Sequence, residues 1–255
     1  MKKIDSGMNT VFGSSWFDLM EALDDRQIES EFEASAHRAS CRIEWPQRDH
    51  LRVRKVVKRS NARRTYKYPS VDVDRMVQCE SELERDAFRL IDACPFVSLV
   101  SEQPAKVIVA AGGVELVYWP DALVDKGGRR IFVEFKHDTE AQDARLRERT
   151  AVVRAALARL GFGYCLLTER VIRAEPRFRN VRYLLRCGRH PVGDADRERI
   201  RRWFAYGGGR RTWSEVSTSS YDPVSRPQLC RLVLDGAVWL PLLEDWQADT
   251  ALHAL

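Results

Sequence analysis

Residues 118–136 read YWPDALVDKGGRRIFVEFK, and this stretch has the pattern of a β-hairpin that carries charges on one face. Apolar residues alternate on either side of the central Gly-Gly pair, and a two-residue type I′ turn needs positive φ at both positions, which glycine adopts readily. With this pair as the turn, opposed residues have numbers that sum to 255, so Asp121 faces Glu134. Lys136 shares the face of Glu134 because side chains alternate along a strand. The hairpin therefore gathers two carboxylates and one ammonium group.

A hard divalent cation accounts for such a cluster of charges. Mg²⁺, or Mn²⁺ in its place, takes oxygen ligands, and two carboxylates together with a substrate phosphate make a suitable site. A lysine beside it can orient an attacking water and stabilise charge that develops on a phosphate. The alternative is a surface ion pair on a solvated sheet face, which the spacing of Glu134 and Lys136 alone favours. The complete order of Pro120-Asp121, a glycine turn and then this pair favours the metal site.

The flanking sequence places the hairpin in an α/β fold. Apolar residues at helical spacing predict a helix over residues 81–93. Shorter apolar runs predict strands, and a longer periodic segment predicts a second helix. These further elements cover residues 97–100, 106–110, 115–123 and 131–136 as strands, 141–160 as a helix and 164–168 as a last strand. The order of helix, three or four strands, helix and strand predicts helices packed on a mixed sheet.

Composition limits the classes of protein that the chain can belong to. It has 255 residues, of which 44% are hydrophobic and 31% charged, as in a soluble globular protein. No apolar run approaches the roughly 20 residues that span a bilayer, and the first residues have no apolar segment of a secretory signal. We therefore expect a cytoplasmic protein without membrane contact. Six scattered cysteines with no CxxC pair argue against a zinc ribbon and against a disulfide framework.

Positive charge is concentrated in residues 51–70, which contain no acidic residue. Segregated positive charge attracts polyanions, and each neutralised phosphate releases counterions. Double-stranded DNA is therefore the expected partner, although a solvated surface segment is the alternative. The basic residues expected to contact DNA are Arg52, Arg54, Lys55, Lys58, Arg59, Arg63, Arg64 and Lys67.

Two motifs together resemble a known family. Pro120-Asp121 followed by Glu134-Phe135-Lys136 between two helices resembles the core of PD-(D/E)xK nucleases. Upstream, residues 81–104 read SELERDAFRLIDACPFVSLVSEQP, which is similar to TnsA-type transposon endonucleases. The resemblance covers residues 78–190 and implies a restriction-endonuclease-like core.

The resemblance also assigns roles to individual residues. It implies that Asp121 and Glu134 bind the metal together with the backbone carbonyl of Phe135, that Glu84 completes the ligand set, and that Lys136 positions the nucleophile. Glu84 has a second interpretation, because Ser81 and Glu84 have the spacing of a capping box at the start of a helix. Its place on the helical wheel, on the side that faces the sheet, favours a ligand.

Other residues of this region are weaker candidates. His137 could touch a phosphate, but a polar surface role is the better interpretation for a single histidine without a partner at a metal-binding spacing. Gln103 precedes a proline at a strand boundary, where a backbone-bonding role is expected.

The chain is expected to have three parts. Residues 1–77 form an N-terminal arm with the basic segment, residues 78–190 the endonuclease domain, and residues 191–255 a small winged-helix-like domain of three short helices and one or two strands. The third of these helices carries Arg226 and Arg231, so it could read DNA, but its apolar residues indicate that much of it is core, and a protein-docking module is an equal alternative. The resemblance implies docking to a transposase and an ATPase.

Together these features predict a metal-dependent DNA endonuclease that cuts one strand at the ends of a mobile element, beside a separate transposase. A restriction-type endonuclease or junction resolvase of the same fold would share the chemistry and differ in substrate. A DNA-end-binding scaffold that has lost activity is the non-enzymatic alternative.

Overall fold

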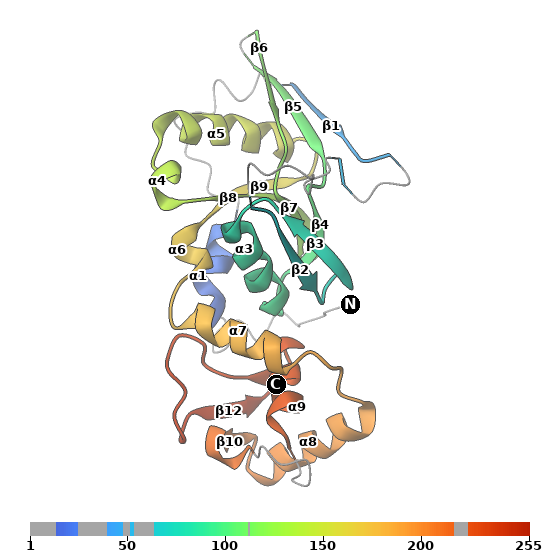
Figure 1. Ribbon diagram of the computed structural model, residues 1–255, viewed down its shortest axis with the longest axis vertical. Coiled ribbons are helices and arrows are strands. Elements are labelled where there is room, and N and C mark those ends of the chain that lie inside the picture. Colours follow the sequence, from blue (N-terminus) through green and yellow to red (C-terminus); the bar gives the residue numbers. More distant parts are fainter. Residues whose placement is uncertain (1–13, 25–39, 48–51, 54–63, 112, 217–223) are drawn as a thin grey trace. The chain divides into compact units, whose positions relative to one another are not determined.

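The computed structural model describes residues 14–24, 40–47, 52, 53, 64–111, 113–216 and 224–255 (Figure 1). The chain divides into two compact units. The central unit comprises the described parts of residues 17–91 and 97–173. The C-terminal unit comprises the described parts of residues 1–16, 92–96 and 174–255. The predicted boundaries after residues 77 and 190 remain predictions.

A four-stranded sheet forms the middle of the central unit. Its strands have the order β4-β7-β8-β9, in which β4 pairs with β7 and β7 with β8 in antiparallel fashion, while β8 and β9 are parallel. Their bounds are Ser98–Glu102 for β4, Ala122–Lys126 for β7, Arg129–Lys136 for β8 and Gly163–Thr168 for β9. The predicted mixed sheet is thus confirmed.

Two helices cover opposite faces of this sheet. On one face, Phe135 of β8 packs edge-on against Phe88 of α3 (Glu82–Ala93), with ring centroids 5.5 Å apart. On the other face, Phe132 joins a buried cluster that includes Ala156 and Leu157 of α5 (Ala144–Ala158). Because Phe132 and Phe135 differ by an odd number of positions, alternation along β8 requires the two helices to lie on different sides, as Figure 1 shows. The mixed α/β class is confirmed.

The hairpin of β7 and β8 has the predicted turn and register. Gly127 and Gly128 have φ of 62° and 89°, which both favour glycine, and nothing lies within 4 Å of where a Cβ would be. Lys126 pairs with Arg129, and the ladder continues to the pair of Ala122 and Val133. The Gly-Gly pair therefore determines which residues of the two strands are opposed.

One predicted strand is wrong. Residues 115–123 were expected to be continuous, but they belong to two sheets, since β6 (Val114–Tyr118) ends before Trp119 and β7 begins at Ala122. The break falls at Pro120, which has no N–H to donate to a ladder. A three-stranded antiparallel sheet has the order β1-β5-β6, with β1 at Ser40–Glu44 and β5 at Lys106–Ala111.

Smaller elements complete the central unit. The hairpin of β2 (Tyr66–Ser70) and β3 (Arg75–Cys79) contacts α3, where the Arg85 guanidinium lies 4.8 Å from the centroid of the Tyr66 ring. The short helices are α1 at Phe17–Ala22, α4 at Asp138–Ala141 and α6 at Glu169–Ile172. The described parts of residues 17–77 and the connections after β8 and β9 thus belong to the same unit.

In its described residues, the C-terminal unit contains three longer helices and a small sheet. Its elements are η1 at Ser14–Trp16, α7 at Arg177–Cys187, α8 at Asp194–Tyr206, β10 at Arg210–Thr212, η3 at Trp213–Glu215, α9 at Arg226–Leu234, β11 at Val238–Trp239 and β12 at Ala251–Ala254. The strands have the antiparallel order β10-β12-β11. The segment expected to form the second short helix is the three-residue 3₁₀ helix η3, and a strand precedes it.

The apolar residues of α9 are core, as expected. Leu229, Leu232 and Val233 are buried. The two arginines of this helix are engaged within the unit, because Arg226 lies 5.3 Å from the centroid of the Trp213 ring and Arg231 forms an ion pair with Asp235. Among the described residues of the chain, no helix is long and apolar enough to cross a bilayer.

Glu102, at the end of β4, is fully buried and balanced by arginine. Its two carboxylate oxygens accept hydrogen bonds from Arg75 at 2.8 and 2.5 Å, and Arg52 lies 3.5 Å away. Removing one partner of a buried ion pair typically costs about 3–5 kcal/mol. Because the Arg75 side chain keeps 21% of its exposure, we expect Glu102→Ala to lower the free energy of unfolding by about 3 kcal/mol, at the lower end of that range.

Urea unfolding monitored by circular dichroism measures this loss. Glu198→Ala serves as a control, because it removes a carboxylate that pairs with Arg201 on the surface of α8 and should leave the midpoint unchanged. Equal midpoints for the two variants would contradict the assignment of Glu102 as a buried anchor.

Candidate functional site

The four side chains expected at the acidic site all come from the central unit. Asp121 lies directly before β7, Glu134 and Lys136 lie on β8, and Glu84 lies in the first turn of α3. Asp121 and Glu134 are not a cross-strand pair, because the regular ladder ends at Ala122. Asp121 nevertheless lies close to Glu134, because it forms hydrogen bonds with the two neighbours of Glu134 on β8.

Asp121 is held by its backbone and by its side chain. Its N–H donates to the Val133 carbonyl at 3.0 Å, and its Oδ2 accepts a hydrogen bond from the Phe135 N–H at 2.8 Å. Its carbonyl accepts from the N–H of Gln103 at 2.9 Å. The Asp121 carboxylate therefore has a defined position at the edge of the hairpin.

Gln103 has an unusual backbone for a residue with a side chain. Its φ is 45°, in the left-handed region, and its carbonyl accepts the Val53 N–H at 3.2 Å. Its Oε1 is buried and has no hydrogen-bond partner in the part of the chain that the structure describes. These bonds come from the backbone of Gln103 and support Asp121, so the backbone-bonding role expected of the Gln103 side chain stays a prediction.

Glu134 is buried but surrounded by donors. Its Oε2 accepts the hydroxyl of Tyr164 at 2.6 Å, its Oε1 lies 3.1 Å from Lys136 Nζ, and Arg149 Nη2 lies 2.9 and 3.1 Å from its two oxygens. Burial raises the pKa of this carboxyl, but the Tyr164 hydrogen bond and the charges of Arg149 and Lys136 outweigh it and hold the pKa below its ordinary value. Glu134 is therefore ionised at neutral pH.

Arg149 and Tyr164 were missed by sequence reasoning. Both come from elements beyond the hairpin, Arg149 from α5 and Tyr164 from β9. Arg149 precedes the buried Val152, Val153 and Ala156 by three, four and seven positions, so it lies on the apolar face of its helix. A charged side chain on an apolar helix face needs a partner, so the position of Arg149 in the helical pattern could have revealed its role. Tyr164, by contrast, gives no local sign that its hydroxyl meets a carboxylate.

Glu84 acts as a cap of α3. Its N–H donates to Ser81 Oγ at 3.1 Å, its Oε1 accepts from the same hydroxyl at 3.2 Å, and its Oε2 accepts the N–H of Glu80 at 2.8 Å. The expected bond from the Glu84 N–H to the Ser81 hydroxyl is therefore confirmed, whereas the Glu84 carboxylate accepts the N–H of Glu80 and not that of Ser81. Capping does not remove Glu84 from the acidic site, because its charge also acts on Asp121.

The pKa of Asp121 is raised well above its ordinary value. Burial of the carboxyl is the largest cause, followed by the negative charge of Glu84, and the charge of Glu134 adds to both. The hydrogen bond from Phe135 and the charge of Lys136 act in the opposite direction but do not compensate. Asp121 and Glu134 thus have pKa values that are shifted apart, a pattern that is frequent in catalytic sites.

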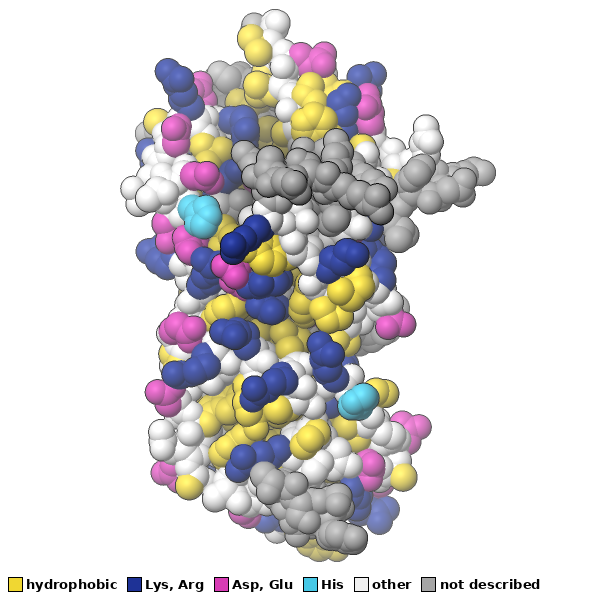
Figure 2. Space-filling model, in the orientation of Figure 1, with side chains coloured by type: hydrophobic (Ala, Val, Ile, Leu, Met, Phe, Trp, Pro, Cys, Tyr) yellow, Lys and Arg dark blue, Asp and Glu magenta, His cyan; other side chains and the backbone are white. Residues whose placement is uncertain are grey.

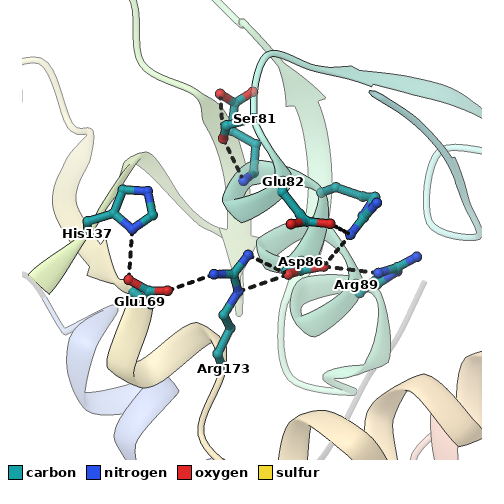
Figure 3. A network of polar contacts seen from close by, with 9 residues as sticks. Ser81, Glu82, Asp86, Arg89, His137, Glu169 and Arg173 are labelled. Atoms are coloured by element: carbon teal, nitrogen blue, oxygen red, sulfur yellow. Dashed lines mark hydrogen bonds and ion pairs between the residues drawn. The ribbon is translucent and has the colours of Figure 1, made fainter. Parts of the chain in front are cut away.

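A polar network connects the residue after Lys136 to α3 (Figure 3). His137 Nδ1 lies 2.7 Å from Glu169 Oε2, and Arg173 donates to Glu169 at 2.6 Å and to Asp86 at 2.9 Å. Asp86 in turn accepts from Arg89 at 3.0 Å. His137 thus has a surface polar partner, as expected, and the network joins the end of β8 to the helix that carries Glu84.

Most of the basic segment lies outside the described residues. This holds for Arg54, Lys55, Lys58, Arg59 and Arg63, whose DNA-binding role stays a prediction. Arg52 lies beside the buried Glu102, and Arg64 and Lys67 are exposed. Phe135 has its N–H on Asp121 and its ring on Phe88, and the role of its carbonyl as a ligand also stays a prediction.

The acidic set suits a hard divalent cation by its chemistry but is not arranged as a preformed metal site. Within the described ranges, no three acidic, histidine or cysteine side chains are grouped as a metal-binding cluster. The oxygens of Glu134 are instead engaged by Lys136 and Arg149. A cation beside Asp121 would offset the burial and the repulsion that raise the pKa of its carboxyl. The residues therefore fit Mg²⁺, provided that the basic side chains on Glu134 move.

No model of a known protein family and no curated protein sequence matches the chain.

The shifted carboxyls predict opposite effects of two conservative substitutions on stability. The pKa of Asp121 in the folded chain lies above the roughly 3.9 of an unfolded aspartate, so its ionisation opposes folding as pH rises through that interval. Asp121→Asn stays neutral and keeps an oxygen for the Phe135 N–H. We expect this variant to have a higher melting temperature than the wild type at pH 7–8, with a difference that disappears below about pH 4.

Glu134→Gln is the matched variant with the opposite sign. The lowered pKa of Glu134 stabilises the fold above about pH 4.3, and this contribution is lost as pH falls through the folded pKa. Glu134→Gln should therefore melt below the wild type at neutral pH. Thermal unfolding across pH in EDTA tests both, and an Asp121→Asn variant less stable than wild type at pH 8 would refute the assignment.

Proposed function

We propose that the chain is a metal-dependent DNA endonuclease that hydrolyses phosphodiester bonds. The observation that carries this proposal is the arrangement at the end of β8. There, Lys136 lies 3.1 Å from an ionised, buried Glu134, next to an Asp121 whose pKa is raised by burial and by two neighbouring carboxylates. An excess of carboxylate at one edge of a sheet, with a lysine beside it, suits a cation and a phosphate better than it suits stability.

The architecture supports the resemblance to PD-(D/E)xK nucleases. The order α3, β4, β7, β8, α5 and β9 follows the helix, mixed sheet, helix and strand that a restriction-endonuclease-like core implies, with β5 and β6 in a separate sheet. The Pro120-Asp121 motif before β7 and the Glu134-Phe135-Lys136 motif of β8 lie together at the open end of the hairpin, opposite the glycine turn. These are the positions that the resemblance gives to the catalytic residues.

Asp121 and Glu134 would hold Mg²⁺ or Mn²⁺, with Glu84 and the Phe135 carbonyl as further ligands. When bound, the cation supplies positive charge to the scissile phosphate and promotes ionisation of water. Lys136 orients the attacking water and stabilises charge on the phosphate oxygens. The water oxygen forms a new bond to phosphorus and loses a proton to solvent, while the bond to one ester oxygen breaks and that oxygen takes up a proton. Arg149 and Tyr164 keep Glu134 ionised and oriented.

The proposed substrate is double-stranded DNA at the ends of a mobile element, cut on one strand beside a separate transposase. This follows from the similarity to TnsA-type endonucleases. The C-terminal unit, with its helices and its β10-β12-β11 sheet, would be winged-helix-like and would dock a transposase and an ATPase. Burial of α9 favours docking over base reading by that helix, because few of its side chains are left to enter a groove. A restriction-type endonuclease or junction resolvase would use the same site on another DNA.

One observation favours an inactive DNA-end-binding scaffold as the second candidate. Lys136 and Arg149 already neutralise Glu134, as in a structural ion-pair network. A scaffold would show neither a metal-dependent rise in melting temperature nor nicking when transposase and ATPase are supplied. An endonuclease would show both.

Metal binding is the first test of the site. A ligand bound only by the folded state stabilises it by mass action, so Mg²⁺ or Mn²⁺ at about 100 times its Kd should raise the melting temperature by about 5–10 °C. Asp121→Ala and Glu134→Ala should abolish this rise. Glu140→Ala removes an exposed carboxylate 3.9 Å from Lys136 and should keep it. A rise that survives in both site variants would place the metal elsewhere.

The lysine separates metal binding from chemistry. Because Lys136 is assigned to the charge that develops in the transition state, Lys136→Ala should keep the metal-induced rise in melting temperature and lower the single-turnover nicking rate by about 100-fold or more. Lys106→Ala, which removes a lysine paired with Glu44 on the other sheet, is the control and should cut at the wild-type rate. An unchanged rate in Lys136→Ala would mean that Lys136 only pairs with Glu134 and takes no part in the chemical step.

A further inference from the structure

Helix α7 in the C-terminal unit has a buried face and an arginine face. Phe178, Val181 and Leu184 are buried on one side. Arg182 and Arg186 are exposed and follow each other at a spacing of four residues, and Arg189 is exposed just beyond the helix end. We call Arg182, Arg186 and Arg189 the arginine stripe. Figure 2 shows Lys and Arg side chains gathered where α7 lies in Figure 1.

The arginine stripe is not neutralised. The segment from residue 177 to residue 190 contains five arginines and no acidic residue. Within the described part of the chain, no carboxylate lies within ion-pair distance of Arg182, Arg186 or Arg189. Their charge therefore remains available to a partner.

The neighbouring helix α8 shows the opposite arrangement. Its Arg199 is paired with Asp196 at 2.6 Å, and Arg201 and Arg202 are paired with Glu198 at 2.7 and 2.8 Å. Arg201 and Arg202 are also exposed and Arg199 is half-buried, but each has a carboxylate three or four residues away, which is the usual form of a solvated helix surface. Exposure alone thus does not distinguish the two helices, whereas the absence of acids on α7 does.

The stripe is presented on a rigid support. The Arg182 guanidinium lies 6.0 Å from the centroid of the Phe178 ring, and that of Arg186 lies 5.5 Å from the centroid of the Tyr183 ring. Asn180 fixes the helix, because its Nδ2 donates to the carbonyls of Leu242 and Glu244 at 3.0 and 2.9 Å. Arginines that stack on aromatic rings lose less side-chain freedom when they bind a ligand.

We propose that the arginine stripe binds the phosphate backbone of double-stranded DNA and forms a second DNA contact, separate from the basic segment of residues 51–70. The planar guanidinium group matches phosphate oxygens in a bidentate manner. Arg182 and Arg186 are about 6 Å apart along the helix axis, which corresponds to roughly two nucleotides of one strand at about 3.4 Å each. The contact adds affinity without reading bases.

The inference rests on the proposed action on DNA but not on catalysis. Its test therefore measures binding of the full chain to a short labelled duplex in EDTA, at several salt concentrations. Each lost phosphate contact lowers the slope of log affinity against log salt by about 0.9, so replacing all three stripe arginines by Gln should reduce the slope by about 2 to 3. The matched triple variant R199Q, R201Q and R202Q removes the same charge from α8 and should keep the wild-type slope.

A second variant guards against a change in structure. Replacing the three stripe arginines by Lys keeps the charge and should retain most of the slope, and melting curves show whether each variant is folded. An unchanged slope in the Gln variant, or an equal loss in the α8 variant, would overturn the proposal. So would a Gln variant that binds poly-glutamate more weakly but the duplex normally, because the stripe would then suit an acidic protein. Failure of metal-dependent nicking would instead count against the proposed endonuclease activity and would leave the DNA-binding proposal for the arginine stripe intact.

Discussion

The buried carboxylate of Glu134 is the interaction on which the candidate site depends. An ionised carboxylate that loses its partners in a protein interior costs several kcal/mol, so the surrounding elements must each supply a donor. Lys136 comes from the same strand, Tyr164 from β9 and Arg149 from α5. The pairing of β8 with β9 and the position of α5 on this sheet are thus both needed to supply donors to Glu134. A carboxylate at this position is compatible with the fold only when all three elements are in place.

Asp121, at the same edge of the sheet, is a carboxylate whose negative charge is compensated much less than that of Glu134. Its carboxyl is buried and repelled by Glu84 and Glu134, and one backbone hydrogen bond and the charge of Lys136 do not compensate its negative form. A protein that maximised stability would place a neutral residue there. The proposed cation would supply the missing positive charge, which would explain why a carboxylate with a raised pKa is kept beside an ionised one.

The features that sequence reasoning predicted correctly are local. The Gly-Gly pair requires positive φ at two adjacent positions, and this alone gives the turn and the register from Lys126 to Ala122. The error at residues 115–123 has a local cause too, because the effect of Pro120 on a ladder was visible in the sequence. The partners of Glu134 could not be found in this way. Tyr164 is 30 positions away and lies in an apolar strand, so its hydroxyl has a role only after β8 and β9 have paired.

The parallel pairing of β8 and β9 has a consequence for the order in which the site can assemble. Antiparallel β7 and β8 need only their glycine turn, whereas parallel neighbours need a crossover, which here contains α5. During synthesis the acidic hairpin can therefore form once residue 136 has emerged, but Glu134 meets Tyr164 only after the crossover and β9 have followed. Contacts between residues far apart in the sequence form late because closing the intervening loop costs entropy. An incomplete chain thus holds its carboxylates in water, without the surroundings that shift their pKa values, and gains the acidic site only when the whole sheet has closed.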